Sequence, residues 1–255
     1  MKPSAKKLLL PGIFVLLSAA LLFAGPVRAG EGADICRPCL DFDHLDKQIR
    51  NGALPKVQAR QQFAARIADL DAFLAGAGNP SRPSGRWVFP LRGYTLATAG
   101  TDAARSYVSA GYDYFDGNHH GGHPSFDLFI TDRNQDSLDD RTEEAVTVVS
   151  MTDGIVVAAE TAWDEHSTLR GGRYLWIYDS ISRALIYYAH NRDLLVKVGD
   201  RVRPGTPLAT VGRSGFNAAK KRSPTHLHLT VLRVANGRPE PDNIYPRLVG
   251  AVPSE

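Results

Sequence analysis

The chain has 255 residues, of which 43% are hydrophobic and 22% are charged, and its formal net charge is +3. This length can form one sizeable domain with a small additional unit. Four of the basic residues, and no acidic one, fall in the first 29 positions, so the remainder has 26 basic and 27 acidic residues and a net charge of −1. This composition excludes a nucleic-acid-binding protein, which needs a concentrated basic face.

The first 29 residues have the three parts of a secretory signal peptide. Three lysines precede an apolar run from Leu8 to Ala24, and small residues lead to a cleavage point after Ala29. A membrane anchor is the alternative, but Pro11 and Gly12 interrupt the run, which is shorter than the roughly 20 apolar residues of a spanning helix. We therefore predict an exported protein, periplasmic or extracellular, with no stable membrane span after cleavage.

The two cysteines of the chain, Cys36 and Cys39, are three positions apart near the predicted mature N-terminus. In an oxidising compartment such a pair is expected to form a local structural disulfide. Redox chemistry would need a thioredoxin-like strand and helix around the motif, and a structural zinc site would need more ligands than these two. The disulfide is therefore the favoured interpretation.

Residues 30–85 are predicted to form a helical segment. Apolar residues recur at helical spacing in two stretches separated by Asn51-Gly52: Phe42, Leu45 and Ile49, then Phe63, Ile67, Leu70 and Leu74. The spacing predicts a pair of packed helices, with a linker from Gly76 to Gly85.

The pattern of residues changes at about residue 86, and residues 86–250 are predicted to form a mainly antiparallel β domain. Short β-branched and aromatic runs alternate with turn signals such as Asp153-Gly154 and Pro204-Gly205. The expected strands are Trp87 to Leu91, Phe126 to Ile130, Val146 to Ser150, Ile155 to Ala159, Tyr174 to Tyr178, Ala184 to Ala189, Pro207 to Val211 and His226 to Arg233. The fold class is therefore α+β overall and mainly β.

Histidines and an aspartate fall in a pattern suited to a metal. His226 and His228 share one face of a strand, and His123 and Asp127 do so if their segment is extended, while His190 ends the strand that begins at Ala184. Catalytic zinc takes three protein ligands from imidazole and carboxylate groups and leaves a position open for water. Any single histidine is more often a structural group, but the combination indicates a zinc site.

These motifs resemble those of the lysostaphin-type, LytM-like family of zinc metallopeptidases. The resemblance is strongest from Ile186 to Val231 and covers about half of the chain. It rests on Tyr188-Ala-His190, Val196-Lys-Val-Gly-Asp-Arg-Val202, Pro204-Gly205, Val211-Gly-Arg-Ser-Gly215 and His226-Leu-His228, and more loosely on His123 to Ala159. It implies an antiparallel LytM-type catalytic domain with His123, Asp127 and His228 as zinc ligands and His190 and His226 as catalytic residues.

The sequence departs from the family pattern in two places. Pro124-Ser-Phe126 replaces the glycine that is common between the first histidine and the aspartate. The segment from Phe216 to Thr225 is longer and more basic than usual, with Lys220, Lys221 and Arg222, which favours a solvated surface over contact with an anionic substrate. A transition-state tyrosine or asparagine has three candidates in Tyr112, Tyr114 and Asn118.

A second metal-like pattern follows Asp127. Asp132, Asn134, Asp136, Asp140 and Glu143 match positions 1, 3, 5, 9 and 12 of a calcium loop. Ser137 stands where such loops carry glycine, and strands rather than helices are expected on both sides. A structural calcium site and a plain acidic surface loop are both compatible with this segment.

Together these features predict a zinc-dependent endopeptidase, and the family resemblance implies that it cuts peptide cross-links of the bacterial cell-wall peptidoglycan or, more narrowly, glycine-rich proteins. A zinc-activated water would attack the peptide carbonyl, while His190 and His226 share proton transfer and oxyanion stabilisation in either assignment. The alternatives are a non-catalytic wall-binding regulator of other hydrolases, and a biotin or lipoate carrier domain, which residues 196–211 also resemble. A carrier needs a lysine at a hairpin tip, and Thr152 to Gly154 has none.

Overall fold

The computed structural model describes residue 1 and residues 35–76, 87–100 and 107–254. The predicted signal peptide and the greater part of the predicted linker lie outside these residues. Residues 35–255 form one compact unit. Its elements are α1 (Arg37–Arg50), α2 (Lys56–Gly76), the 3-10 helix η1 (Tyr114–His119), β1 (Ser125–Phe129), β2 (Thr147–Val149), β3 (Gly154–Glu160), β4 (Arg173–Asp179), β5 (Ala184–Leu194), β6 (Arg201–Val202), β7 (Pro207–Val211), β8 (His226–Ala235), β9 (Arg238–Pro241) and α4 (Tyr245–Val249).

The strands form one antiparallel sheet, as predicted, with the order β1-β8-β5-β4-β3-β6. β9 pairs with the C-terminal part of β8, while β7 joins β5 and β2. The predicted strand at Trp87 to Leu91 is not formed, because only Val88 and Leu91 make isolated bridges, to Val252 and Val148. β6, β9 and α4 lie in segments for which no element was predicted.

Side chains alternate between the two faces of the sheet and feed two apolar clusters. Along β8, Leu227 and Leu229 enter a cluster with β1, β2 and β7, whereas Leu232 and Val234 enter a second cluster with the helices. Burying each such side chain contributes about 1.5–3 kcal/mol. The face of β8 that carries His226 and His228 is therefore the face that the helices cover farther along.

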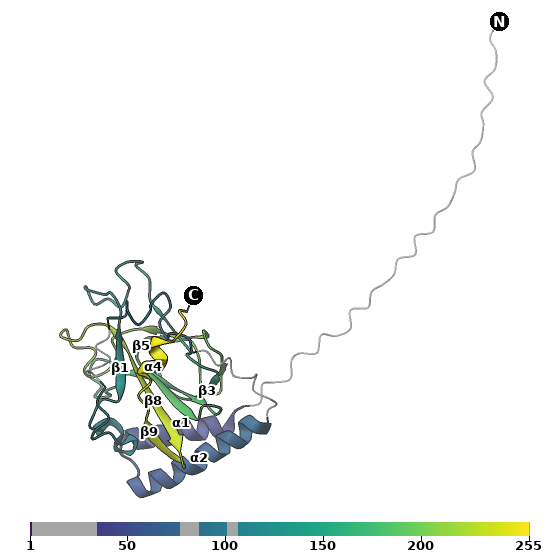
Figure 1. The fold of residues 1–255 in the computed structure, drawn as a ribbon, viewed down its shortest axis with the longest axis vertical. Helices are drawn as coiled ribbons and strands as arrows, with labels where there is room; N and C mark the ends of the chain where they lie inside the picture. Colours follow the sequence, from purple (N-terminus) through teal and green to yellow (C-terminus); the bar gives the residue numbers. More distant parts are fainter. Residues whose placement is uncertain (2–34, 77–86, 101–106, 255) are drawn as a thin grey trace. The chain divides into compact units, whose positions relative to one another are not determined.

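The predicted helical pair is present, and α1 packs against α2 and β3 (Figure 1). Phe42 and Phe63 are buried at their interface, with ring centroids 5.7 Å apart. The predicted disulfide joins Cys36 and Cys39. Cys36 is the N-cap of α1, so the disulfide holds the first turn of this helix.

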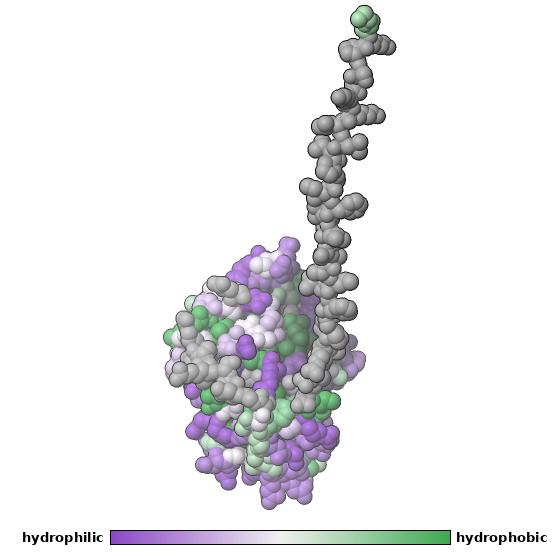
Figure 2. Space-filling model, turned by 90° about the vertical axis from the view of Figure 1, so that its right-hand side faces the viewer, coloured by the Kyte–Doolittle hydropathy of each residue, from purple (hydrophilic) through white to green (hydrophobic). Residues whose placement is uncertain are grey.

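The surface is mixed rather than dominated by one apolar area. On the face shown in Figure 2, small apolar patches are separated by hydrophilic residues. Exposed large apolar side chains occur in separate elements and include Ile35, Val57, Leu195 and Val249. Among the described residues, no helix combines the length and apolar character needed to cross a membrane.

Candidate metal centre

Strand pairing brings Asp127 and His228 together. The two residues face each other in the register between β1 and β8, 101 positions apart in the sequence. Nδ1 of His228 lies 3.0 Å from Oδ1 of Asp127. Two positions further along the same pairing, the hydroxyls of Ser125 and Thr230 are hydrogen-bonded at 2.6 Å, which supports the same register on the same face of the sheet.

His123 completes the cluster from the segment that leads into β1. The backbone N–H of His123 donates to the carbonyl of Val108 at 2.6 Å, and the carbonyl of His123 accepts from the N–H of Val108 at 2.8 Å. These two bonds fix the backbone immediately before Pro124. Nε2 of His123 lies 3.4 Å from Oδ1 of Asp127, and its ring centroid is 4.9 Å from that of His228. The bulky Pro-Ser-Phe interior of the motif therefore leaves the histidine and the aspartate in contact.

His190 reaches the cluster through an unusual backbone conformation. On β5, Leu185 and Ala189 face the helical cluster while Ile186 and Tyr188 face the other one, so regular alternation would turn His190 away from the site. His190 has φ +66°, and the pairing of β5 shifts register just beyond it. This left-handed residue redirects the side chain, and its ring centroid lies 5.3 Å from that of His228.

Backbone carbonyls set the tautomers of the two remaining histidines. Nδ1 of His190 lies 2.8 Å from the carbonyl oxygen of Ser214, and Nδ1 of His226 lies 2.7 Å from that of Pro224. A carbonyl oxygen only accepts, so in both rings Nδ1 carries the proton and Nε2 is left as the acceptor. Nε2 of His226 is 3.7 Å from Oδ1 of Asp127, so this basic edge faces the cluster.

The electrostatics favour neutral imidazoles around one ionised carboxylate. Burial disfavours the charge of Asp127, but hydrogen bonds from His123 and His228 overcome this and hold the pKa of its carboxyl well below the usual range. Burial lowers the pKa of His190 well below its ordinary value, with a further contribution from His226 and His228. Burial likewise lowers the pKa of His228. Neutral imidazole and ionised carboxylate are the forms that bind metals.

The donor set fits a zinc ion. Ligand atoms of His123, Asp127 and His228 lie within 4.8 Å of one another, and this is the one such group of histidine, cysteine and acidic residues in the described parts of the chain. Two imidazoles and one carboxylate are the donors of a three-ligand catalytic zinc site. The cluster opens into a cavity of about 210 Å³ that His190 and His226 also line.

The acidic loop does not assemble a comparable group. The carboxylate of Asp132 accepts from the backbone N–H groups of Asp136 and Ser137, and from the hydroxyl of Thr225 at 2.6 Å. Asp139, beside the predicted ligand Asp140, binds Arg141 and the hydroxyl of Tyr94. Asn134 donates to Asp136, Asp140 accepts from the N–H of Arg133, and Glu143 has φ +59°. The side chains thus shape the loop, and the calcium site stays a prediction.

The three candidates for a transition-state group line one cavity beside the metal cluster but make different contacts. The hydroxyl of Tyr114 donates to Asp46 at 2.8 Å beneath α1. Asn118 bridges two loops, since it donates to the carbonyl of Thr168 and accepts from the N–H of Arg170. Tyr112 stacks edge-on against His120, at 4.8 Å between ring centroids.

Residues that the motifs did not single out also border the metal cavity. Tyr187, Arg170 and His120 line it, and the guanidinium of Arg170 donates to the carbonyl of His120 at 2.7 Å. Strand alternation alone would have indicated Tyr187, which lies on the same face of β5 as Leu185 and Ala189. On the other side, the basic segment contributes Asn217, while Nζ of Lys220 lies 3.9 Å above the ring of Phe216.

A model of a known peptidase family matches part of the chain. The model of peptidase family M23 matches residues 133–240, which include His190, His226 and His228 as well as the carrier-like residues 196–211. His123 and Asp127 precede the matched range, and the structure brings them to the same cluster.

Similar solved structures include a putative glycyl-glycine endopeptidase lytM from Ruminococcus gnavus, with 28% identity over 65% of this chain and 60% of that chain and a TM-score of 0.43. The catalytic domain of lysostaphin from Staphylococcus simulans shows 21% identity over 56% of this chain and 89% of that chain, with a TM-score of 0.37. A putative peptidase M23 from Pseudomonas aeruginosa shows 16% identity over 75% of this chain and 64% of that chain, with a TM-score of 0.37. The chain thus spans less than two thirds of the first of these relatives. Through residues 133–240 of its β domain, this chain is thus similar to peptidase family M23.

Proposed function

We propose that this protein is an exported, zinc-dependent endopeptidase that hydrolyses peptide cross-links of peptidoglycan. The observation that carries the proposal is the convergence of His123, Asp127 and His228, whose ligand atoms lie within 4.8 Å of one another. His190 and His226 stand beside them with ring centroids 4.9 Å apart. The match of residues 133–240 to a peptidase family supports hydrolysis of a peptide bond, and cross-link peptides are the substrate that the family resemblance implies.

His123, Asp127 and His228 would hold the zinc ion. When bound, zinc lowers the pKa of a coordinated water and polarises a carbonyl group. His190 and His226 would carry out the proton transfers. Because Nδ1 of His190 and of His226 donates to a backbone carbonyl, each ring presents Nε2 as an acceptor, and one of the two would take a proton from the attacking water and pass it to the leaving amine. The carbonyl partners also prevent the rings from rotating, which keeps both groups oriented before substrate arrives.

The disulfide between Cys36 and Cys39 supports an oxidising location outside the cytoplasm. The predicted signal peptide is consistent with the same proposal.

The test combines metal content with product identification. We expect the purified protein to contain about one zinc per chain and to release new peptide ends from intact sacculi. His226→Ala should abolish release while zinc remains, because His226 is not a proposed ligand, whereas Asp127→Ala should remove both. His166→Ala is the matched control, since this exposed histidine lies outside the cluster and should change neither. A wild-type protein that holds no zinc and leaves sacculi intact would instead favour a wall-binding regulator.

A further inference from the structure

A second cavity adjoins the metal cavity and reaches beneath α1. Its volume is about 80 Å³, and Asp46, Ile49 and Arg50 of α1 form part of its lining. The two cavities share the residues His120, Arg170, Gly171, Tyr187 and His228. Because His228, a proposed ligand, borders both cavities, the second cavity lies directly beside the proposed metal site.

The helices make this cavity a blind end. On the site face of β8, the side chains follow in the order His226, His228, Thr230, Leu232 and Val234. The first two belong to the metal cluster and Thr230 lines the second cavity, whereas the last two are buried in the cluster that contains α1 and α2. The groove floor therefore continues from the metal for about one residue before the helical pair covers the sheet.

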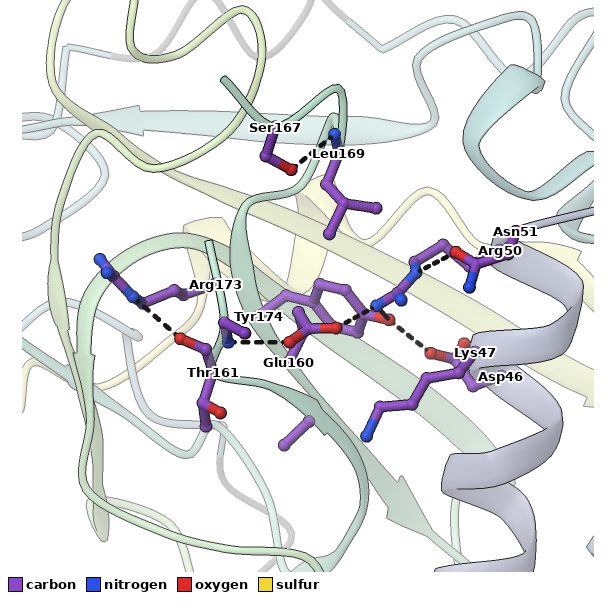
Figure 3. Close-up of polar contacts among 12 residues, drawn as sticks. Asp46, Lys47, Arg50, Asn51, Glu160, Thr161, Ser167, Leu169, Arg173 and Tyr174 are labelled. Carbon is purple, nitrogen blue, oxygen red and sulfur yellow. Dashed lines mark hydrogen bonds and ion pairs between the residues drawn. The ribbon is translucent and has the colours of Figure 1, made fainter. Parts of the chain in front are cut away.

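The wall is fixed by a polar network (Figure 3). Nη1 of Arg50 binds Glu160 at 2.6 Å and the hydroxyl of Tyr174 at 3.0 Å. That hydroxyl donates to Asp46 at 2.7 Å, and Tyr114 donates to the second carboxylate oxygen at 2.8 Å. Each charge at the base of the cavity thus has partners within the protein. Because Asp46 and Glu160 already have partners, a cationic ligand group would find no carboxylate free to pair with it there, and burying it would be unfavourable.

Much of the remaining lining is aromatic or apolar, although polar residues such as Asn118, Ser125, Arg170 and Thr230 also contribute. Tyr112, Trp176 and Tyr187 form walls, and Leu169 and Ile49 close the space between them. Tyr112 and Tyr187 make no hydrogen bond through their hydroxyls within the described residues, so they can donate to a peptide group at the mouth. A dry cavity of about 150 Å³ holds a benzene molecule, so a space half that size suits a side chain of one to three carbons.

We propose that this cavity is a specificity subsite that takes a small, uncharged side chain of the peptide and excludes cationic or bulky ones. The inference rests on the proposed peptidase function and adds the role of the helical pair. Residues 35–76, which include the three wall residues of α1, lie outside the range matched by the family model. Selectivity at this position is therefore a property that the N-terminal segment gives to this chain.

The first test widens the cavity from the helix side. Ile49→Ala removes a buried side chain that lines the cavity, and Leu45→Ala removes a similar buried side chain one turn away on α1 that does not line it. On peptides that differ only in the residue entering the subsite, wild type should favour alanine over leucine and lysine by about tenfold or more in kcat/KM. Ile49→Ala should reduce the alanine-to-leucine ratio by about tenfold, while Leu45→Ala leaves it within about twofold.

The second test does not depend on hydrolysis. In the zinc-loaded protein labelled at isoleucine methyl groups, an alanine peptide should shift the Cδ1 resonance of Ile49 saturably, and a lysine peptide at equal concentration should not. Ile49→Val assigns this resonance and serves as the milder variant where Ile49→Ala does not fold. Cleavage with an unmoved ratio and an unmoved resonance overturns the subsite and leaves the peptidase standing. A shifted resonance without cleavage supports the subsite and refutes the proposed activity.

Discussion

Replacing Gly215 by alanine should reduce activity by displacing the neighbouring side chain of His190. Gly215 has φ +113°, a conformation that favours glycine, and a Cβ there would overlap the carbonyl oxygen of Arg170 and lie 2.8 Å from Nδ1 of His190. The same Nδ1 donates to the carbonyl of Ser214 at 2.8 Å. The added methyl group therefore occupies space that this hydrogen bond requires, and the His190 ring must move.

Gly205→Ala separates this effect from the general cost of backbone strain. Gly205 also has a positive φ, +86°, but a Cβ added there would meet open space, with no other atom within 4 Å. Each variant should lose about 1–2 kcal/mol of unfolding free energy because a left-handed backbone disfavours alanine. Gly215→Ala should lose about 1–3 kcal/mol more, since backbone and ring atoms must shift to relieve the overlap.

Gly215→Ala should differ from Gly205→Ala far more in hydrolytic activity than in unfolding free energy. A displacement of a catalytic group by about 1 Å costs on the order of 100-fold in rate, so we expect that loss for Gly215→Ala and little change for Gly205→Ala. Urea unfolding measures the stabilities, and kcat/KM on a cross-linked muropeptide measures the activities. Equal stabilities together with equal hydrolysis in the two variants would show that His190 does not depend on this close approach, and the reasoning would be wrong.

Three further predictions concern the wall, the acidic loop and the metal. In a double-mutant cycle, Arg50→Met and Glu160→Gln should show a coupling of about 2 kcal/mol in unfolding free energy, because both side chains are largely buried, at 16% and 12% exposure; a coupling within the roughly 0.2–1 kcal/mol of surface pairs would contradict this. The Arg141 guanidinium lowers the pKa of Asp139 to about 2 from 3.8, so its contribution of about 2 kcal/mol is present above pH 4 and lost as the pH falls towards 2. Asp139→Asn should flatten unfolding free energy against pH over that interval, and an unchanged slope would argue against the assignment. Removing zinc with a chelator should lower Tm in wild type, since ligand binding stabilises the folded state, but should leave the Tm of Asp127→Ala unchanged.

Local patterns in the sequence predict the elements that strand and helix periods determine. The apolar spacing around Phe42 and Phe63 predicts both helices, and the period of two predicts that His226 and His228 share a face. These features depend on neighbours within a few positions. The predicted strand from Trp87 to Leu91 was wrong. Its apolar side chains pack into the core, but its backbone forms only isolated bridges and no continuous ladder of hydrogen bonds.

Features that depend on long-range packing could not be predicted in this way. The side-chain direction of His190 depends on a positive φ in a non-glycine residue, for which the sequence carries no signal. The contribution of Asp46 and Arg50 to a cavity beside the metal requires α1 to dock on the sheet, more than 100 residues away along the chain. Helical periodicity shows that α1 has a buried face but does not identify the surface it covers.

The proposed metal site can form only when β1 and β8 pair in the correct register, because this register brings Asp127 and His228 together. A slip of one residue between β1 and β8 would place Leu227 or Leu229 opposite Asp127. His228 would then lie on the opposite face of the sheet from Asp127. A mispaired chain would thus lose its affinity for zinc at the same time as its core. Metal added during refolding should consequently select the correctly aligned strands, and zinc retention after refolding would measure the fraction of molecules in the native register.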